Sequence, residues 1–402
     1  MQLKIEADRV VVPGLTNVHS HCFQRAIRGR TETRSAAHRD SFWTWREAMY
    51  RAANRLTPED LYHVARMAFL EMLLAGITTV GEFHYLHNAP DGARYDDPNR
   101  LALAVVRAAE DVGIRIVLLR TAYARAGFHL PPNPLQARFV TPSAAAFIAD
   151  TEALRRALPD VPIGVAPHSV RALPLDYLLE IVSFARANNL PVHMHVAEQP
   201  AEIEACLAEH GRRPIELLAE QGVLHASFTG IHAIHITDRE IAMLAAAHSR
   251  VCACPTTERN LGDGPVPAAR LTNAGVGICF GSDSNVQIDL LEDARSLEYH
   301  LRMVELARAI LKPDSLLTGL TQTGSAALGV TTEPSDYFTL DLNDSSLAGA
   351  DADSLLPALL FSTNRTAVRD VFVNGRRIVE NGRHALQEEI VREFRAVCRH
   401  LL

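Results

Sequence analysis

A short apolar run near the start of this sequence ends in two histidines that could bind a metal ion. The run is Leu15-Thr-Asn-Val-His-Ser-His21. On a β-strand, side chains two positions apart point the same way, so His19 and His21 would project together from the strand end. Two neutral imidazoles there suit a zinc-like divalent ion, although they also fit simple packing. The preceding Val-Pro-Gly at 12–14 favours the metal, as do three later strand-like runs that end in His or Asp.

Three later strand-like runs carry further groups of this kind. They end in His193-Met-His195-Val-Ala-Glu198, in Ile231-His232 and in Phe280-Gly-Ser-Asp283. Three histidines and an aspartate are a chemically sensible set of ligands for Zn²⁺, which keeps a further position for water. Such an ion makes water acidic and polarises an electrophilic carbon, and an aspartate beside it can accept a proton from the water. A nearby Glu and His can then protonate a leaving group and stabilise the developing charge.

Two of these histidines have competitors nearby in the sequence. His193 and His195 point to the same side of their strand, so spacing alone does not decide which of them faces the metal. The strand-end position favours His232 over His235, which fits a loop. The segment at 256–264 follows the next strand and could shape a pocket, but nothing in it suggests a catalytic role.

Eight strand-like runs alternate with helix-like runs along the chain. The strand-like runs lie at 15–21, 77–83, 115–123, 161–169, 190–198, 228–235, 251–257 and 276–283, and helical runs separate most of them at 57–75, 99–112, 142–157, 174–188, 213–221 and 237–247. Near-continuous apolar strands of this number predict a parallel (β/α)8 barrel of the TIM type. A doubly wound open sheet is the alternative, but no dinucleotide fingerprint or glycine-rich phosphate loop supports it. Barrel enzymes place their reactive groups at the carboxyl ends of the strands, where the polar residues above fall.

Both ends of the chain predict a small β-unit beside the barrel. Residues 3–12 form a short extended run, 337–341 alternates, and 368–379 contains a hairpin signal at Asn374-Gly375. We therefore expect an N-terminal strand within 1–12, the barrel at 13–332, and a C-terminal β-unit with a terminal helix at 333–402. Further helices are expected at 289–311, 314–328 and 388–402.

The composition is that of an ordinary globular protein, with 48% hydrophobic and 22% charged residues. A net charge of -7 with no long basic run argues against a nucleic acid or an anionic membrane as partner. No apolar run is long enough to cross a bilayer, and the N-terminus lacks a signal-peptide pattern. The six cysteines are scattered, which predicts reduced core thiols and a cytoplasmic protein.

The set of polar strand ends resembles a known group of enzymes. His19-Ser-His21, the pair His195 and Glu198, His232 and Asp283 are similar to the metal-dependent hydrolase barrels of the amidohydrolase superfamily. Blocks at 19–26, 40–46, 82–85, 168–171, 195–199 and 257–264 resemble its formimidoylglutamate deiminase branch, which acts in histidine degradation. The block Asp40-Ser-Phe-Trp-Thr-Trp-Arg46 is far more specific than the superfamily-wide His-x-His. Together the blocks cover most of the chain.

This resemblance implies a role for each residue of the reacting centre. One divalent metal ion, Zn²⁺ by preference, would be bound by His19, His21, His195 and Asp283. Asp283 would also accept a proton from the attacking water, and His232 would orient that water and polarise the formimino carbon. Glu198 would hydrogen-bond the formimino nitrogen and shuttle a proton to departing ammonia. These ligand types do not by themselves select zinc over iron or manganese.

The resemblance also implies a small dicarboxylate substrate, N-formimino-L-glutamate, and a homodimer. The positions that match the family's substrate contacts are Gln24, Arg46, Tyr85, His168 and Arg171. Arginines suit the task because a guanidinium binds a carboxylate through two parallel hydrogen bonds. Arg46 lies in a long aromatic segment between the first strand and the first helix, and Arg171 lies two residues past the fourth strand. Both places favour a site over the surface.

Two other functions remain open at this stage. The first is another amidine or aminated-ring deaminase of the same superfamily, for which replacing Arg46 or Arg171 would barely change turnover. The second is a non-catalytic barrel that serves as a scaffold. Such a barrel would be expected to lack some of the ligands or proton-shuttling residues, and the sequence has them all.

Overall fold

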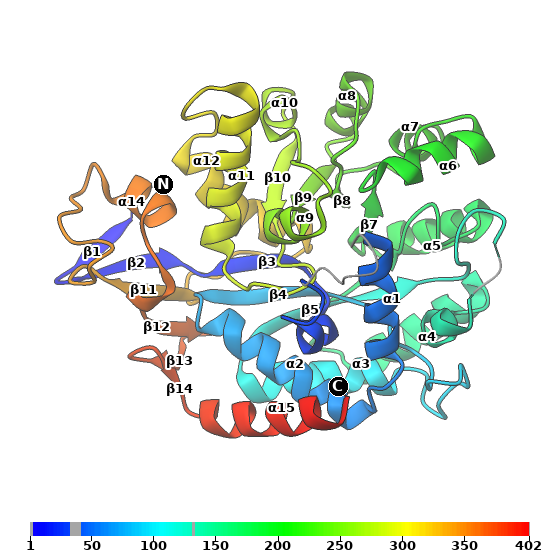
Figure 1. The fold of residues 1–402 in the computed structure, drawn as a ribbon, viewed down its shortest axis with the longest axis horizontal. Coiled ribbons are helices and arrows are strands. Elements are labelled where there is room, and N and C mark those ends of the chain that lie inside the picture. Colours follow the sequence, from blue (N-terminus) through cyan, green and yellow to red (C-terminus); the bar gives the residue numbers. More distant parts are fainter. Residues whose placement is uncertain (1–2, 33–41, 131–132, 402) are drawn as a thin grey trace.

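The structure, a computed structural model, describes residues 3–32, 42–130 and 133–401. Its main body is a barrel of eight parallel strands surrounded by helices, with a second sheet at one side (Figure 1). Asp40 and Ser41, the first two residues of the predicted block at 40–46, lie outside the described residues. Within the described part of the chain, no helix combines the length and the apolarity that are needed to cross a membrane.

The eight barrel strands follow one another in chain order, and each is parallel to the next. They are β3 (Leu15–Ser20), β4 (Ile77–His84), β5 (Arg115–Ala122), β6 (Ile163–Pro167), β7 (Val192–Val196), β8 (Phe228–His232), β9 (Arg250–Ala253) and β10 (Gly277–Phe280). Nearly every residue of these strands is buried, because helices cover the outside and side chains fill the inside. The predicted barrel is confirmed.

The first and last strands meet through the segment that follows β10. The backbone N–H of Asp283 donates to the carbonyl of His19 at 2.9 Å, and the N–H of His21 donates to the carbonyl of Asp283 at 2.9 Å. His19 on β3, His21 just after β3 and Asp283 after β10, all proposed metal ligands, are therefore fixed against each other by the backbone. The same backbone hydrogen bonds that close the barrel therefore also fix the relative positions of these three site residues.

Helices on the outside hold the strands in place. They are α2 (Pro58–Leu73), α3 (Arg100–Val112), α4 (Ala144–Ala157), α5 (Leu175–Ala187), α6 (Pro200–His210), α7 (Pro214–Glu220), α8 (Asp238–Ala246), α10 (Ala268–Asn273) and α11 (Leu290–Glu305). The start of α2 follows from its sequence: the Thr57 side chain accepts from the N–H of Asp60, and Pro58 occupies the first turn. The predicted helix at 314–328 is α12 (Pro313–Thr318) and α13 (Gly324–Ala327), joined by a π-helical turn at Gly319–Thr323.

Two predictions about individual elements were wrong. The seventh strand was expected at 251–257, but β9 ends at Ala253 and α9 (Pro255–Leu261) begins at once. Pro255 explains the change, since proline cannot donate to a sheet and its fixed φ suits the first turn of a helix. The long aromatic segment between the first strand and the helix predicted at 57–75 was expected to hold no helix, but it contains a 3₁₀ turn at Cys22–Ile27 and the helix α1 (Phe42–Ala53).

The chain ends form the second sheet, as the sequence predicted. Its antiparallel strands are, in spatial order, β1 (Lys4–Glu6), β2 (Arg9–Pro13), β11 (Tyr337–Asp341), β12 (Val368–Val373), β13 (Arg376–Glu380) and β14 (Arg383–His384). Asn374 and Gly375 have φ of 51° and 72°, which the predicted tight hairpin turn requires. The terminal helix α15 (Gln387–Leu401), red in Figure 1, packs on α2, where Arg66 pairs with Glu389 at 2.8 Å. Domain boundaries at 13 and 333 stay predictions.

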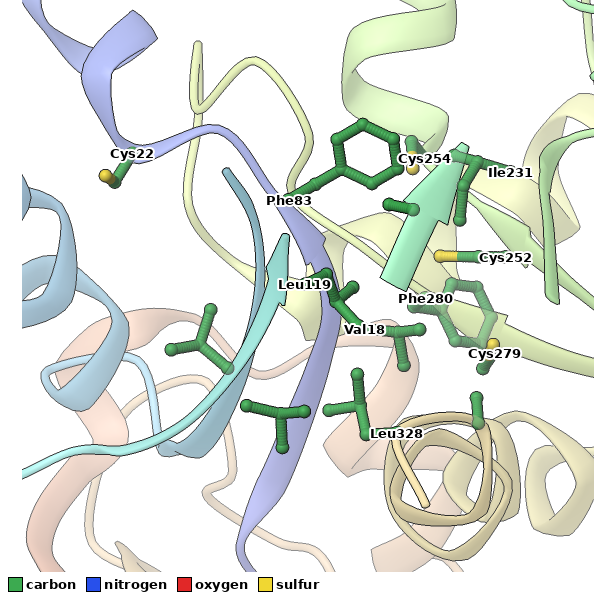
Figure 2. Close-up of a cluster of buried hydrophobic side chains, with 14 of the residues drawn as sticks. Val18, Cys22, Phe83, Leu119, Ile231, Cys252, Cys254, Cys279, Phe280 and Leu328 are labelled. Atoms are coloured by element: carbon green, nitrogen blue, oxygen red, sulfur yellow. The ribbon is translucent and has the colours of Figure 1, made fainter. Parts of the chain in front are cut away.

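The interior of the barrel is apolar below the carboxyl ends of the strands. Val18, Leu119 and Phe280, each about fully buried, come together from β3, β5 and β10 (Figure 2). Close packing of this kind keeps the strands at fixed spacing. The six cysteines are free thiols, as predicted, and five of them are buried. The polar residues at the carboxyl ends of the strands therefore lie directly above a tightly packed apolar interior.

Candidate active site

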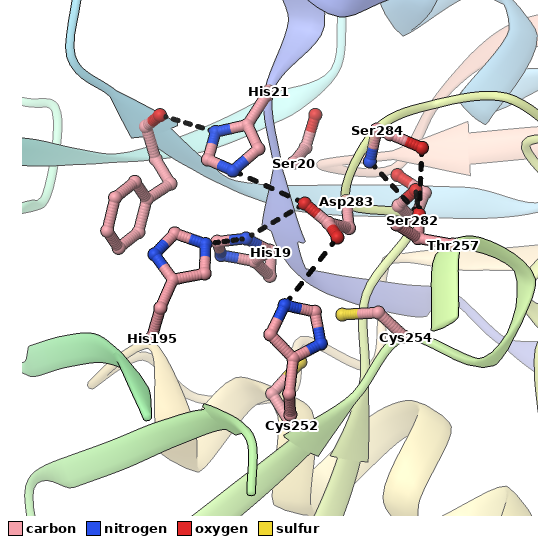
Figure 3. Close-up of polar contacts among 12 residues, drawn as sticks. His19, Ser20, His21, His195, Cys252, Cys254, Thr257, Ser282, Asp283 and Ser284 are labelled. Atoms are coloured by element: carbon pink, nitrogen blue, oxygen red, sulfur yellow. Dashed lines mark hydrogen bonds and ion pairs between the residues drawn. The ribbon is translucent and has the colours of Figure 1, made fainter. Parts of the chain in front are cut away.

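Four side chains converge at the carboxyl ends of β3, β7 and β10. They are His19, His21, His195 and Asp283, and one ligand atom from each lies within 4.8 Å of the others. Nε2 of His19 and Nε2 of His21 are each 3.3 Å from Oδ1 of Asp283. Nε2 of His195 is 3.1 Å from Nε2 of His19 (Figure 3). All four residues are buried.

The second ring nitrogen of two of these histidines fixes the tautomer. Nδ1 of His21 lies 3.0 Å from the carbonyl oxygen of Phe83, and Nδ1 of His195 lies 3.1 Å from that of His168. A carbonyl only accepts, so Nδ1 carries the proton in both rings and Nε2 presents a lone pair to the cluster. Burial lowers the pKa of His19 to about 3, so this ring is neutral. Lone pairs that converge in this way fit a divalent cation.

Local backbone geometry explains why these residues can approach each other. A Cβ added to Gly281 would lie 2.7 Å from Cβ of His19 and 2.8 Å from its carbonyl oxygen, so only glycine fits beside β3. Asp283 has a φ of 46°, a strained value for a residue with a side chain. Asn285 holds the turn, since its Nδ2 donates to the carbonyl of His21 at 3.0 Å.

A second group of ionisable residues lies next to the four. His232 is fully buried, and its Nδ1 lies 3.2 Å from Oε1 of Glu258. Its Nε2 lies 3.7 Å from Oε1 of Glu198 and 3.7 Å from Oδ2 of Asp283. Burial would lower the pKa of His232, but the carboxylates of Glu198 and Glu258 outweigh it and raise that pKa well above its ordinary value. Burial raises the pKa of Glu198. Both shifts favour the protonated form of the group, which suits proton transfer.

A small cavity opens above these residues, with a volume of about 50 Å³. Its lining includes every residue predicted to touch substrate, namely Gln24, Arg46, Tyr85, His168 and Arg171. The proposed catalytic residues line it too, and of the four proposed ligands only His19 lies behind its wall. The structure thus brings all the predicted site residues together at one end of the barrel.

Two of the lining residues bring positively charged groups into the cavity. Arg46 projects from α1, with its guanidinium carbon 5.7 Å from the centre of the Tyr50 ring. Burial lowers the pKa of Arg46, and the charge of Arg171 lowers it further. Arg171 makes no ion pair within the ranges that the structure describes. Two half-buried cations that line one cavity favour an anionic ligand.

The two histidine competitors point elsewhere. Nε2 of His193 lies 2.8 Å from the carbonyl of Ala327, at the core side of its strand. Nε2 of His235 lies 3.0 Å from the carbonyl of Asp263. Neither is in the converging cluster, so the geometry agrees with the choice of His195 and His232.

Sequence reasoning missed several residues of the cavity. Tyr50 and Tyr123 line it, and both hydroxyls accept from Nε2 of Gln136, at 2.9 and 2.7 Å. Tyr123 follows the end of β5, so its place after a strand was a usable signal. Glu258 was given no role, because it lies in the first turn of α9 and not at a strand end. Its approach to His232 could not be read from spacing.

Comparisons with known proteins agree with this geometry. The sequence profile of the amidohydrolase family matches residues 10–378. A formimidoylglutamate deiminase of Pseudomonas aeruginosa is 39% identical, over 98% of this chain and 89% of its own. A 5-methylthioadenosine/S-adenosylhomocysteine deaminase of Thermodesulfovibrio yellowstonii is 26% identical, over 94% of this chain and 82% of its own. The crystal structure of an amidohydrolase from Brucella melitensis, 34% identical, superimposes with a TM-score of 0.91, covering 99% of this chain and 95% of that one.

Proposed function

We propose that this chain, which belongs to the amidohydrolase family, deiminates N-formimino-L-glutamate to N-formyl-L-glutamate and ammonia. Its family and its relatives indicate a hydrolase that acts on carbon–nitrogen bonds. The observation that carries this proposal is the pair Arg46 and Arg171 in the cavity that holds the converging histidines. Two guanidinium groups match the two carboxylates of the substrate. The relative from Pseudomonas aeruginosa, named a formimidoylglutamate deiminase, supports the same substrate.

The family is metal-dependent, and we propose Zn²⁺ held by His19, His21, His195 and Asp283. A divalent cation supplies Lewis acidity, which makes water acidic and the carbon of a C=N group electrophilic. The neutral imidazoles and the buried carboxylate described above fit such a cation in donor type and number. Hydrogen bonds from Nδ1 to backbone carbonyls hold two of the rings in the required orientation.

The protein's own groups move the protons. Asp283 takes a proton from the attacking water as the oxygen adds to the formimino carbon. His232, kept protonated by its two carboxylate neighbours, donates a hydrogen bond to the oxygen and stabilises the charge that develops there. Glu198 passes a proton to the formimino nitrogen, the carbon–nitrogen bond breaks and ammonia leaves. One water is consumed for each ammonia released.

The experiment that tests the proposal is ammonia release from N-formimino-L-glutamate by purified protein of known zinc content. We expect release to be abolished by Asp283→Asn. Arg46→Met and Arg171→Met should each cost about 2–5 kcal/mol in kcat/KM, because a buried carboxylate of the substrate loses its partner. Arg308→Met, at an exposed arginine outside the cavity, is the matched control and should behave as wild type. No ammonia from the fully metallated protein would refute the proposal.

A second candidate is a deaminase of another amidine or of an aminated ring. The likeness to the deaminase of Thermodesulfovibrio yellowstonii is the observation that favours it. Ammonia from 5-methylthioadenosine, undiminished by Arg171→Met, would support this candidate against the first. Zinc in place of iron or manganese, the homodimer, the cytoplasmic location and the lack of a nucleic-acid partner all stay predictions from the sequence.

A further inference from the structure

A cysteine side chain lies next to the converging histidines and is not used by the proposed mechanism. Cys254 follows β9, is fully buried, and its sulfur points toward Asp283 (Figure 3). Together with His232 and Asp283 it forms a second group whose ligand atoms all lie within 4.8 Å of one another. The group offers one nitrogen, one sulfur and one oxygen from buried side chains.

Each of the three has an atom to offer. Nδ1 of His232 faces Glu258, so that Nε2 is the nitrogen turned toward the group, and it has no hydrogen-bond partner among the described residues. Asp283 has two oxygens: Oδ1 faces His19 and His21 at 3.3 Å, while Oδ2 faces His232 at 3.7 Å. A buried ring nitrogen that makes no hydrogen bond is unfavourable, and a cation that displaces its proton would satisfy it.

We propose that His232, Cys254 and Asp283 form a second binding site for a thiophilic divalent cation such as Zn²⁺ or Cd²⁺. Binding replaces the S–H bond of Cys254 by a metal–sulfur bond and the Nε2–H bond of the His232 imidazolium by a metal–nitrogen bond, and both protons go to water, so the charge balances with two protons per divalent ion. Asp283 would be shared through its two oxygens, Oδ1 with the first site and Oδ2 with the second. Sulfur makes the second site the softer of the two, so it should favour Cd²⁺ more strongly than the first site does.

Occupation of this site should inhibit the enzyme. This consequence rests on the proposed function, in which His232 stabilises charge and Asp283 accepts a proton. An ion at Nε2 of His232 and Oδ2 of Asp283 takes both groups out of the reaction. Excess metal would therefore act as an inhibitor at the same centre where the first ion is required.

The test begins with holoenzyme that contains one equivalent of Zn²⁺, to which Cd²⁺ is added. Only the second site contains sulfur, so a cadmium–thiolate charge-transfer band in the ultraviolet reports on it directly, whether or not the protein deiminates anything. We expect the band to saturate at one further equivalent, with two protons released. Activity on N-formimino-L-glutamate should fall in parallel.

Cys254→Ser is the decisive variant, with Cys254→Ala as a second change that removes every possible ligand atom. Each should keep its first zinc ion and its basal activity but lose the band, and excess Zn²⁺ should inhibit it more weakly by more than about tenfold. Cys398→Ser, at a half-buried thiol on α15, is the matched control and should behave as wild type. The proposal is overturned if wild type shows no band, or if the band persists in either Cys254 variant. Retained inhibition by Zn²⁺ in both variants would also overturn it.

Discussion

The contact between Glu258 and His232 gives a sharp test of how the site works. Oε1 of Glu258 lies 3.2 Å from Nδ1 of His232 and also accepts from the N–H of Cys254 at 2.8 Å. Both side chains are buried. Glu258→Gln keeps the shape and an acceptor oxygen but removes the charge, whereas Glu258→Leu removes the acceptor as well. Glu258→Gln therefore measures the effect of the carboxylate charge on His232, and the further loss in Glu258→Leu measures the effect of the hydrogen bond that orients the ring.

The magnitudes follow from the kind of interaction that each variant loses. A hydrogen bond to a charged group contributes about 1.5–3 kcal/mol and a neutral one about 0.5–1.5 kcal/mol. Glu258→Gln should thus cost about 1–2 kcal/mol in the transition state, or roughly tenfold in kcat. Glu258→Leu leaves the ring of His232 without its buried partner, which costs about 3–5 kcal/mol, or roughly 10²–10⁴-fold.

The assay is kcat and KM for ammonia release, measured with zinc content and thermal unfolding on the same samples. We expect kcat to fall with KM nearly unchanged, because Glu258 acts through His232 and does not line the cavity. Glu298→Gln is the control: Glu298 is equally buried, but it pairs with Arg302 away from the site. Wild-type kcat in Glu258→Gln, or equal kcat in the two Glu258 variants, would refute the reasoning.

Three further predictions concern stability and metal binding. Burial raises the pKa of Asp293 from 3.8 to about 8. The folded state therefore binds this proton more tightly than the unfolded state, and the free energy of unfolding should fall by up to about 5 kcal/mol as pH rises from about 4 toward 8. Asp293→Asn should flatten the curve of unfolding free energy against pH. An unchanged curve would contradict this. Gly281→Ala should cost about 1–3 kcal/mol and lower the zinc content by displacing His19, whereas Gly127→Ala, whose added carbon meets its nearest neighbour at 3.4 Å, should do neither. Removing zinc with a chelator should lower Tm, since an ion at 100 times its Kd contributes about 2.7 kcal/mol, and an equal Tm with and without zinc would argue against the four-residue site.

The fold was predictable because a barrel strand carries its signal locally. Runs such as 77–83 and 228–235 are apolar throughout and end in polar residues, which reveals both the strand and the end that faces the site. The pairing of residues 3–12 with the C-terminal sheet followed from the same logic. The end of β9 was wrong because Cys252 and Cys254 continue the apolar pattern through the point where Pro255 starts a helix.

The site was predictable only where chemistry and position coincide. Histidines and an aspartate at strand ends indicate a candidate metal centre. The carboxylate of Glu258, which lies 3.2 Å from His232, comes instead from the helix α9, so its position depends on the tertiary structure. Tyr50 lies on α1, in the long segment between β3 and α2, and the sequence does not indicate where this segment lies relative to the barrel. Tyrosines are also common in protein cores, so the residue type alone does not indicate that Tyr50 and Tyr123 line a cavity. Such residues become visible only when distances can be measured.

The closure of the barrel has a consequence for how the protein is made. Asn285 holds His21 across 264 positions of sequence, and Asn17 holds Ser282 across 265. Contacts this distant form late, because the whole intervening chain must first be ordered. At a synthesis rate of about 5–20 residues per second, Asp283 is added to the chain roughly 10–50 s after His21. Asp283 is the last of the four proposed ligands to be made, so under the proposed function uptake of an ion would require a finished barrel and would belong to the last stage of maturation.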